Sequence, residues 1–457
     1  MKKVVKSLLV ILFLLTLTFM FFVGCGTNQS NSNEFVIDDQ VSLSVWITWP
    51  INRRIETVYA PLFSALNPFI SLDVSFIFIT HFLEQRNLTL MAGNAPDMFL
   101  LEGLNYHLPD NSRLLADWRP VMESHPDFNP DDYFMNVFEA VTGMDGRLTA
   151  FPTNFFFGLV AANTTVPGLV DALAQTNGVN EATLMNLAQE FGIGSNNNPL
   201  YIHPGFTLRR TASINWMTGG YIQSFLDIQN IKADFDNLRF ISFIENTLAL
   251  TTTNPTLLTH ILGGVTIHSK AQTIANSERY MFMNFWPTFP QMFLPIYEPV
   301  FAGHTPITNH LGELAIFPWV VWGLNINTST EQQQAAWEFI RFMQQPERID
   351  VGSPMIMVST YKPHMRHDFS RLIHHRALLA QGWQLTTDTF DEALEAGIAL
   401  IENIGSLPMT DGMQISGVIL DVLLEVFDQF EHGFITAEQA AEDLQSRMTL
   451  MLMEMNW

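Results

Sequence analysis

The sequence has very little cysteine and few basic residues for its length. Only one of its 457 residues is a cysteine, so no disulfide framework within the chain can stabilise the fold. Lys and Arg together number 22 against 45 Asp and Glu, and this acidic balance argues against a nucleic-acid partner. Hydrophobic residues make up 47%, which is a globular composition, and the length allows two or three domains.

Motifs for phosphate binding and for nucleophilic catalysis are also lacking. There is no glycine-rich phosphate loop, no G-x-S-x-G, no internal repeat and no long low-complexity region. His364, His367, His374 and His375 lie close together in sequence, with Asp368 beside them, and could line one helix face as zinc ligands. Histidines of this kind are more often surface residues, so we expect neither a metal nor a cofactor.

The N-terminal residues form a separate segment. Residues 1–6 are basic and residues 7–23 are apolar and uncharged, the pattern of a secretory signal. An uncleaved anchor helix is the alternative, because the run is nearly long enough to span a bilayer. Gly24 precedes Cys25, and Phe22-Val23-Gly24-Cys25 is similar to the lipobox of bacterial lipoproteins. We therefore expect a signal peptide over 1–24, lipidation of Cys25, a flexible tether over 25–40 and an extracytoplasmic body anchored to the cell membrane.

Strand and helix patterns alternate after the tether. Strict alternation over 41–50 predicts a strand that stops at Pro50, with Val41 and Ile47 on the same face. The patterns that follow predict, in chain order, a helix over 53–66, a strand over 72–79, a helix over 82–92 and a strand over 98–101. Such alternation is typical of a mostly parallel α/β sheet, whose ligands bind beyond the carboxyl ends of the strands. Glu102 follows the last of these strands and is expected to face that site.

Further elements are predicted later in the chain. Residues 148–154 are predicted to be extended, and residues 155–162 and 280–286 to be apolar strands. Ser or Thr three residues before Glu or Gln indicates a capping box, which predicts helix starts at 328–331 and at 436–439.

Four segments together resemble extracellular solute-binding protein family 1, the sugar-capturing receptors of bacterial ATP-driven importers. They are "LTLMAGNAPDMFLL", "GRLTAFPTNFFFGLVAANTTV", "INTSTEQQQAAWEFIRFMQQPE" and "FITAEQAAEDLQSRM". They are similar to the family's Gly-x-x-Pro-Asp strand entry, the crossover between its lobes, an Ala-x-x-Phe helix of the first lobe and the closing helix. Each motif alone is weak, but their order and spacing match over nearly the whole mature chain.

The resemblance implies a two-lobed periplasmic-binding-protein-like fold of type II. Each lobe would hold a mostly parallel sheet flanked by helices, and a hinge would join the two lobes. The lobes are expected over 41–152 plus 306–358 and over 153–305 plus 359–457. Ligand would bind between the lobes and be buried by their closure. The resemblance implies no catalytic activity. The implied partner is a membrane permease with ATPase subunits, and this protein is expected to be a monomer.

Sugars bind through aromatic rings on their apolar faces and through polar groups on their hydroxyls. The expected ligand contacts follow strand ends or lie where the family has such contacts: Trp49, Glu102, Asn105, Trp216, Trp286, Trp319 and Trp322. The Trp286 segment lacks the family's glycine, and Trp319 and Trp322 stand where the family more often has two glycines. The alternative for the aromatic residues is packing in a core, and for the polar ones solvation at a strand end.

The sequence therefore predicts a receptor that captures a carbohydrate, most simply an oligosaccharide, and delivers it to the permease. One alternative is the same fold with a different solute, such as a polyamine or a peptide. Another is a secreted polysaccharide-active enzyme, which would need two carboxylates about 5–10 Å apart.

Overall fold

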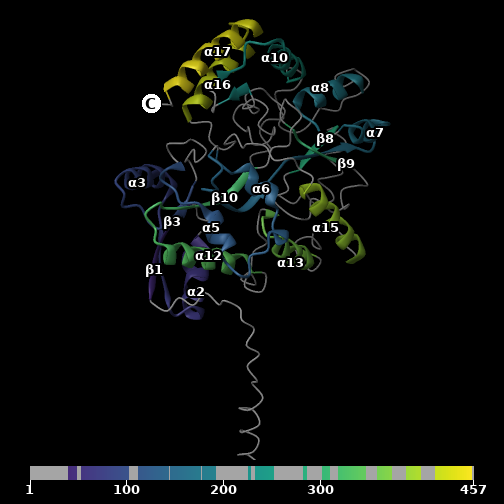
Figure 1. Ribbon diagram of the computed structural model, residues 1–457. Coiled ribbons are helices and arrows are strands. Elements are labelled where there is room, and N and C mark those ends of the chain that lie inside the picture. Colours follow the sequence, from purple (N-terminus) through teal and green to yellow (C-terminus); the bar gives the residue numbers. More distant parts are fainter. Residues whose placement is uncertain are drawn as a thin grey trace, which may run out of the picture.

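A computed structural model describes most of the chain that follows the tether (Figure 1). The described residues are 40–48, 53–101, 112–143, 145–176, 178–191, 225–227, 232–251, 281–285, 301–308, 317–345, 358–372, 387–402 and 417–454. They form α/β structure, as the sequence predicts, with strands gathered into separate sheets and helices packed around them.

The larger sheet has six strands in the order β11-β4-β10-β3-β1-β2. Their bounds are β1 Val41–Ile47, β2 Ile70–Phe76, β3 Met98–Leu100, β4 Phe151–Phe156, β10 Phe317–Leu324 and β11 Val358–Ser359. A second sheet has the order β8-β5-β9, with β5 Leu159–Asn163, β8 Phe282–Phe285 and β9 Phe301–Pro306. The short strands β6 Leu226–Asp227 and β7 Lys232–Ala233 pair with each other.

Helices surround both sheets. Those that precede β5 in the chain are the π-helical turn Ile55–Tyr59, α2 Ala60–Leu66, α3 Ile79–Met91, α5 Trp118–Glu123, the 3-10 turn Pro130–Asp132 and α6 Met135–Ala140. Those that follow are α7 Leu169–Ala174, α8 Glu181–Glu190, α10 Leu238–Thr251, α12 Thr330–Gln344, α13 Lys362–Leu372, α15 Thr387–Glu402, α16 Gly417–Glu431 and α17 Ala437–Glu454. Within the ranges described, none of these helices combines the length and hydropathy needed to cross a membrane.

The described side chains form two large hydrophobic cores. The first core joins β1, β3 and β10 to α2, α5 and α12, so it draws on residues 41–151 and 321–342. The second core joins β5 and β8 to α7, α8, α10, α16 and α17, and draws on residues 160–307 and 422–452. Each core is thus built from discontinuous sequence, and Figure 1 shows α16 and α17 at the opposite end of the molecule from β1 and α2.

The larger sheet is mixed, which corrects the expectation of a mostly parallel sheet. β1 is parallel to β2 and β3, whereas β10 is antiparallel to both β3 and β4, and β11 is antiparallel to β4. The physical reason is the path of the chain: β4 leaves this sheet for the second one, and β10 returns from it in the opposite direction. In the second sheet, β5 is antiparallel to both β8 and β9.

The apolar run 155–162 is divided between two strands rather than forming the single strand predicted. β4 ends at Phe156 in the larger sheet, and β5 begins at Leu159 in the second sheet. Periodicity could not reveal this break, because residues on both sides of it are apolar and buried.

The predicted helix caps are present, one of them shifted. α12 is capped by Ser329 and Gln332 rather than by Thr328 and Glu331, one residue later than predicted. At α17, Thr436 and Gln439 exchange the expected pair of bonds: the Thr436 N–H donates to the Gln439 side chain, and the Gln439 N–H donates to the Thr436 hydroxyl.

The residue limits of the lobes stay a prediction. Residues 362–402 were expected in the second lobe, yet α13 and α15 contact the part of the chain that precedes β4. Asn136 on α6 donates to the carbonyl oxygen of Ile401, and the Lys362 ammonium bonds to the carbonyl oxygen of Asp131.

Asp97, from the Pro-Asp pair in the segment "LTLMAGNAPDMFLL", joins β1 to β3. Asp97 Oδ2 accepts hydrogen bonds from the Ser44 backbone N–H (2.8 Å) and from the Ser44 hydroxyl (2.7 Å). The Asp97 N–H donates back to the Ser44 hydroxyl at 2.9 Å, and Asn325 and Thr328 both donate to the Asp97 carbonyl. Asp97 therefore holds β1, β3 and the end of β10 together.

We expect Asp97→Asn to lower the free energy of unfolding by about 1–2 kcal/mol, because two charge-assisted bonds become neutral ones. Urea unfolding of the variant measures this. The matched control is Asp73→Asn, which changes an exposed acid on β2 and should stay within about 0.5 kcal/mol of the parent. Equal losses in the two variants would show that the Asp97 bonds add no net stability.

Candidate ligand-binding site

Strand direction places four strand ends at one edge of the larger sheet. β1, β2 and β3 are mutually parallel, and β4 runs the same way because both β3 and β4 are antiparallel to β10. β4 then continues directly into β5 of the second sheet. We call this the junction edge, defined by Thr48, residues 76–78, Leu101 and residues 156–158. It is the edge at which an open α/β sheet binds ligands.

An exposed aromatic ring lies at the junction edge. Phe78 follows β2, is 65% exposed and meets Phe76 edge-on, with ring centroids 5.3 Å apart. The Arg53 guanidinium lies 5.0 Å from the centroid of the Phe76 ring, and Arg53 also forms an ion pair with Glu56. This arrangement supplies an open ring face beside a fork of hydrogen-bond donors, and both suit a sugar ring with its hydroxyls.

Buried groups support this edge from below. The Arg86 side chain on α3 is fully buried, and its guanidinium donates to the Leu100 carbonyl at 3.2 Å, at the end of β3. The same guanidinium lies 5.3 Å from the Phe82 ring centroid and donates to the Asn87 side chain. Arg86 thus fixes α3 against β3, and Phe78 directly precedes the first residue of α3.

The connecting segments that contain Gly158 and Ile307 are hydrogen-bonded to each other beside the junction edge. The Ile307 N–H donates to the Gly158 carbonyl at 2.8 Å, and the Val179 N–H donates to the Pro306 carbonyl at 2.9 Å. A Cβ atom on Gly158 would lie 2.6 Å from Ile307 Cδ1, so the two connecting segments pass each other as closely as packing permits.

The buried Thr360 hydroxyl joins the end of β11 to β4. Thr360, directly after β11, is fully buried, and its hydroxyl lies 2.9 Å from the Pro152 carbonyl oxygen and 3.2 Å from that of Thr153. Gln344 at the end of α12 donates to the same hydroxyl at 3.2 Å. The next residue, Tyr361, packs on Tyr133. The pKa of the Tyr133 hydroxyl is raised above its ordinary value, mainly because the group is buried and secondly because Tyr361 lies close to it.

Most of the site residues predicted from sequence lie outside the described part of the chain: Trp49, Glu102, Asn105, Trp216, Trp286 and the lipidation residue Cys25. Trp49 comes directly after Thr48, and Glu102 directly after Leu101, so both follow strand ends at the junction edge. Trp319 lies near the start of β10, which is also at this edge, and its side chain is outside the described set. Their contacts with ligand stay predictions.

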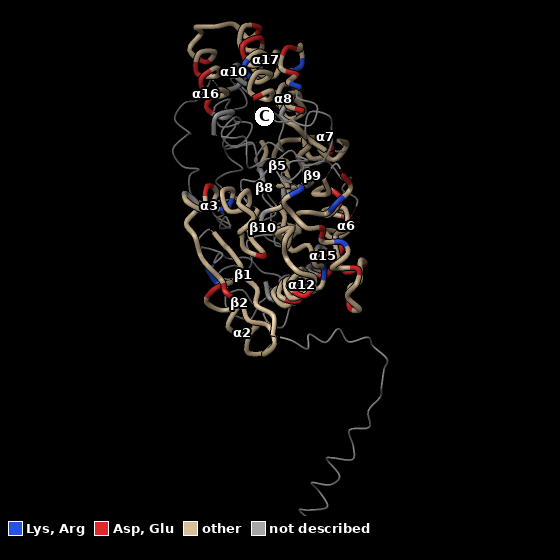
Figure 2. The backbone as a smooth tube through the Cα atoms, turned by 60° about the vertical axis from the view of Figure 1, so that its left-hand side comes forward, with Lys and Arg blue, Asp and Glu red and all other residues tan. Residues whose placement is uncertain are grey.

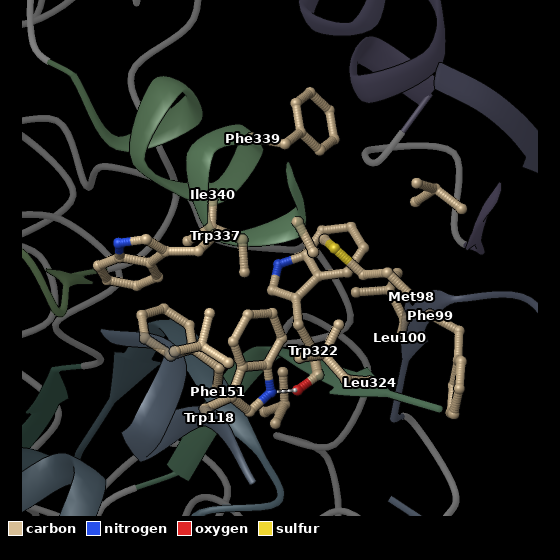
Figure 3. Close-up of a cluster of buried hydrophobic side chains, with 14 of the residues drawn as sticks. Met98, Phe99, Leu100, Trp118, Phe151, Trp322, Leu324, Trp337, Phe339 and Ile340 are labelled. Atoms are coloured by element: carbon tan, nitrogen blue, oxygen red, sulfur yellow. Dashed lines mark hydrogen bonds between the residues drawn. The ribbon is translucent and has the colours of Figure 1, made fainter. Parts of the chain in front are cut away.

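Trp322 lies in the first core. Its side chain is fully buried, and its position in β10 pairs with Leu100 on one side and Phe151 on the other. The Trp322 carbonyl accepts a hydrogen bond from the Trp118 indole at 3.1 Å (Figure 3). The structure therefore places Trp322 among core residues rather than beside Phe78, and its predicted contact with ligand remains to be tested by substitution.

Phe78 was missed because the predicted strand ran too far. A strand over 72–79 makes Phe78 an interior position, whereas β2 ends at Phe76 and Phe78 precedes the first residue of α3. Residues 76–79 are all apolar, so no break in the sequence marked the end of the strand at Phe76. The candidate residues that the structure adds are Phe76, Phe78 and Arg53.

Metal binding finds no support in this part of the protein. Among the described residues, no group of three or more His, Cys, Asp or Glu side chains is placed to hold a metal ion. His364 and His367 lie on α13, with His364 fully buried, while His374 and His375 fall outside the described ranges.

Comparison with known proteins shows similarity in fold. No protein-family model and no curated protein matches the chain. A solved family 1 extracellular solute-binding protein from Alicyclobacillus acidocaldarius matches 91% of this chain and 99% of its own, with 12% identity and a TM-score of 0.58. The sugar-binding protein MalE from Xanthomonas citri matches 91% and 98%, with 15% identity and a TM-score of 0.59. A structure described as a designed esterase matches 90% and 98%, with 14% identity and a TM-score of 0.56.

The similar structures are mainly binding proteins, and the matches extend over almost their whole length. This agrees with two cores of discontinuous sequence joined by connecting segments that meet at the junction edge. The chain therefore has the two-lobed fold of the extracellular solute-binding proteins.

Proposed function

We propose that this protein is an extracytoplasmic receptor that captures a carbohydrate between its lobes and delivers it to an ABC permease. The observation that carries the proposal is the exposed Phe78 ring, with Arg53 nearby, at the carboxyl ends of parallel strands on the edge that leads into the second sheet. Trp49, Glu102 and Asn105 follow strand ends at the same edge and would complete a polar and aromatic lining.

The mechanism that we infer is closure of the lobes on the ligand. A ligand that touches both lobes only in the closed state shifts the population toward that state by its differential affinity. The segments that must bend are those around Gly158 and Ile307, because β4 leads through Gly158 into β5 of the second sheet, and Ile307 follows β9, from which the chain returns to β10. No step of this mechanism makes or breaks a covalent bond, so the receptor would release its ligand unchanged.

The proposal includes a membrane anchor. The pattern over residues 1–25 supports export and lipidation of Cys25, with residues 26–40 as a flexible tether that holds a monomeric receptor near its permease.

A polyamine is the second candidate ligand, because acidic residues outnumber basic ones by about two to one and would attract a cation. A peptide ligand and polysaccharide cleavage are further outcomes that the same experiment separates.

The test is a thermal-shift screen of the purified protein against mono- and oligosaccharides, polyamines and peptides. A ligand at 100 times its dissociation constant should add about 2.7 kcal/mol of stability, and a carbohydrate recovered unchanged is the expected hit. Phe78→Ala should weaken binding of that carbohydrate about tenfold, which corresponds to about 1.4 kcal/mol of lost stacking and burial. Calorimetric titration measures this change.

The matched control is Phe434→Ala, which removes a ring that is at least as exposed from the turn between α16 and α17. It should leave the affinity unchanged. Stabilisation by a polyamine or a peptide alone would overturn the carbohydrate assignment while keeping the receptor function, and cleavage of a saccharide would overturn the receptor function itself.

A further inference from the structure

An uncharged apolar surface lies on α2, far from the junction edge. All of its members are apolar and exposed, and we call them the α2 patch: Pro61, Leu62, Ala65, Leu66, Pro68 and Phe69. Leu62 is 44% exposed, and Leu66 and Phe69 are each 55% exposed. The opposite face of α2 is a normal core face, since Phe63 is buried and packs edge-on against Phe339 and Phe342. The patch is therefore additional apolar surface that the fold does not use.

The patch lies where the N-terminal segment joins the folded body. The Val41 N–H donates to the Phe69 carbonyl at 2.8 Å, so β1 begins directly beside the patch. Residues 1–40 precede this point, and they include the apolar run 7–23 and Cys25. Figure 2 shows α2 at the end of the molecule opposite α16 and α17.

Charge is absent from this region of an otherwise charged protein. Residues 57–72 contain no Asp, Glu, Lys or Arg, although the chain has 67 such residues in total, 22 basic and 45 acidic. In Figure 2 the tube over α2 accordingly has neither red nor blue. An uncharged surface can approach a lipid headgroup region without the repulsion that the acidic remainder of the protein would experience.

We propose that the α2 patch is a membrane-docking surface, which rests on the bilayer interface and orients the anchored receptor. This docking proposal rests on the membrane anchor in the proposed function, because the anchor is what keeps the protein beside a bilayer. A flexible tether over residues 26–40 spans on average roughly 20 Å. The tether holds the patch near the lipid at an effective concentration of about a millimolar. At that concentration the patch can bind the bilayer even if its own affinity for lipid is low. Leu and Phe are residues that interfacial surfaces insert.

The test uses the full chain with its own lipid anchor in phosphatidylcholine vesicles. A polarity-sensitive fluorophore is attached at Ala65→Cys within the patch, or at Ser446→Cys on the exposed face of α17 as the matched control. In the anchored protein Cys25, the only native cysteine, would carry the proposed lipid and would not react with the label. We expect the label at 65 to shift to the blue and to lose most of its quenching by aqueous iodide, and the label at 446 to do neither.

A combined Leu62→Ser, Leu66→Ser and Phe69→Ser variant should abolish the shift at 65 while the protein still floats with the vesicles. A Leu450→Ser and Met453→Ser variant, which changes exposed apolar residues on α17, should keep it. Equal iodide access at positions 65 and 446 on vesicle-bound protein would overturn the proposal. So would protection at 65 that depends on protein concentration and not on lipid, because that would indicate a second copy of the chain.

Flotation with vesicles tests the lipid anchor, whereas the spectral shift at position 65 tests docking, so the two can fail separately. If the protein does not float with vesicles, Cys25 is not lipidated and that part of the proposed function is wrong. The protein is then labelled in a Cys25→Ser background, so that only position 65 or 446 reacts, and is held through an N-terminal hexahistidine segment on nickel-chelating lipids with residues 26–40 retained. A blue shift at 65 under this tethering supports docking, and its absence refutes it.

Discussion

Replacing Trp322 with alanine is expected to lower the free energy of unfolding by about 3–5 kcal/mol, because it removes the largest kind of side chain from a fully buried position. Trp322 lies in the middle of the larger sheet, between β3 and β4. Figure 3 shows its ring directed toward α12, in the same cluster as Trp118, Phe151 and Trp337. Urea unfolding followed by near-ultraviolet circular dichroism measures the loss.

The surroundings of Trp322 explain the size of this effect. The rings of Trp118 and Phe151 lie 5.3 Å apart, and those of Phe151 and Trp337 lie 5.5 Å apart, so several large side chains share one space. Such side chains belong to β10, β4 and two helices, and a cavity among them cannot close without moving these elements together.

The conservative variant Trp322→Phe is the control. Within the described part of the chain the Trp322 indole nitrogen has no hydrogen-bond partner, so phenylalanine loses volume but no bond there. We expect its loss to be about 1–2 kcal/mol. If Trp322 instead contacts ligand, Trp322→Ala will reduce ligand affinity and leave the stability of the free protein within about 1 kcal/mol of the parent.

Elements whose signal is local could be read from the sequence. β1 begins at Val41 and alternates as predicted, because one face of it is buried and period-2 patterning follows directly, although it ends at Ile47 and not at the predicted Pro50. α12 and α17 also begin close to where their caps predict, since a capping hydroxyl and its partner are only three residues apart.

Features that depend on distant parts of the chain could not be read. The direction of β10 is set by its return from the second sheet, and nothing within Phe317–Leu324 encodes direction. The same holds for the break between β4 and β5, where burial on both sides conceals a change of sheet.

The sequence led to the sheet edge at which the candidate site is placed, but it did not identify the residues that the structure describes there. The rule for strand ends led from sequence to the junction edge, which the strand pairings then define. Phe78 depended on where β2 ends, and boundaries of elements are the least certain part of a reading from sequence. Trp322 shows the converse: a tryptophan beside glycine in sequence is here a core residue.

Gly158→Ala is expected to lower the free energy of unfolding by about 2 kcal/mol, through a single contact between the two connecting segments. The new Cβ would lie 2.6 Å from Ile307 Cδ1 and 3.1 Å from Ile307 Cβ. Rotation of the Ile307 side chain can move Cδ1 but not Cβ, and the bond from the Ile307 N–H to the Gly158 carbonyl holds the backbones together. The lower entropy of alanine in the unfolded chain offsets about 0.4–1 kcal/mol of the strain.

A double-mutant cycle isolates this contact. Ile307→Ala alone should cost about 2–4 kcal/mol, because Ile307 is buried in the second core. In the double variant the alanine at 307 leaves room for the new methyl group at 158, so the combined loss should be smaller than the sum by at least about 1 kcal/mol. Urea unfolding of the four proteins gives this coupling, and additive losses would show that the two segments do not press on each other. If the lobes close as proposed, the two connecting segments must bend at this contact. Gly158→Ala should then also weaken the compaction that small-angle scattering detects when ligand is added, and the double variant should restore it.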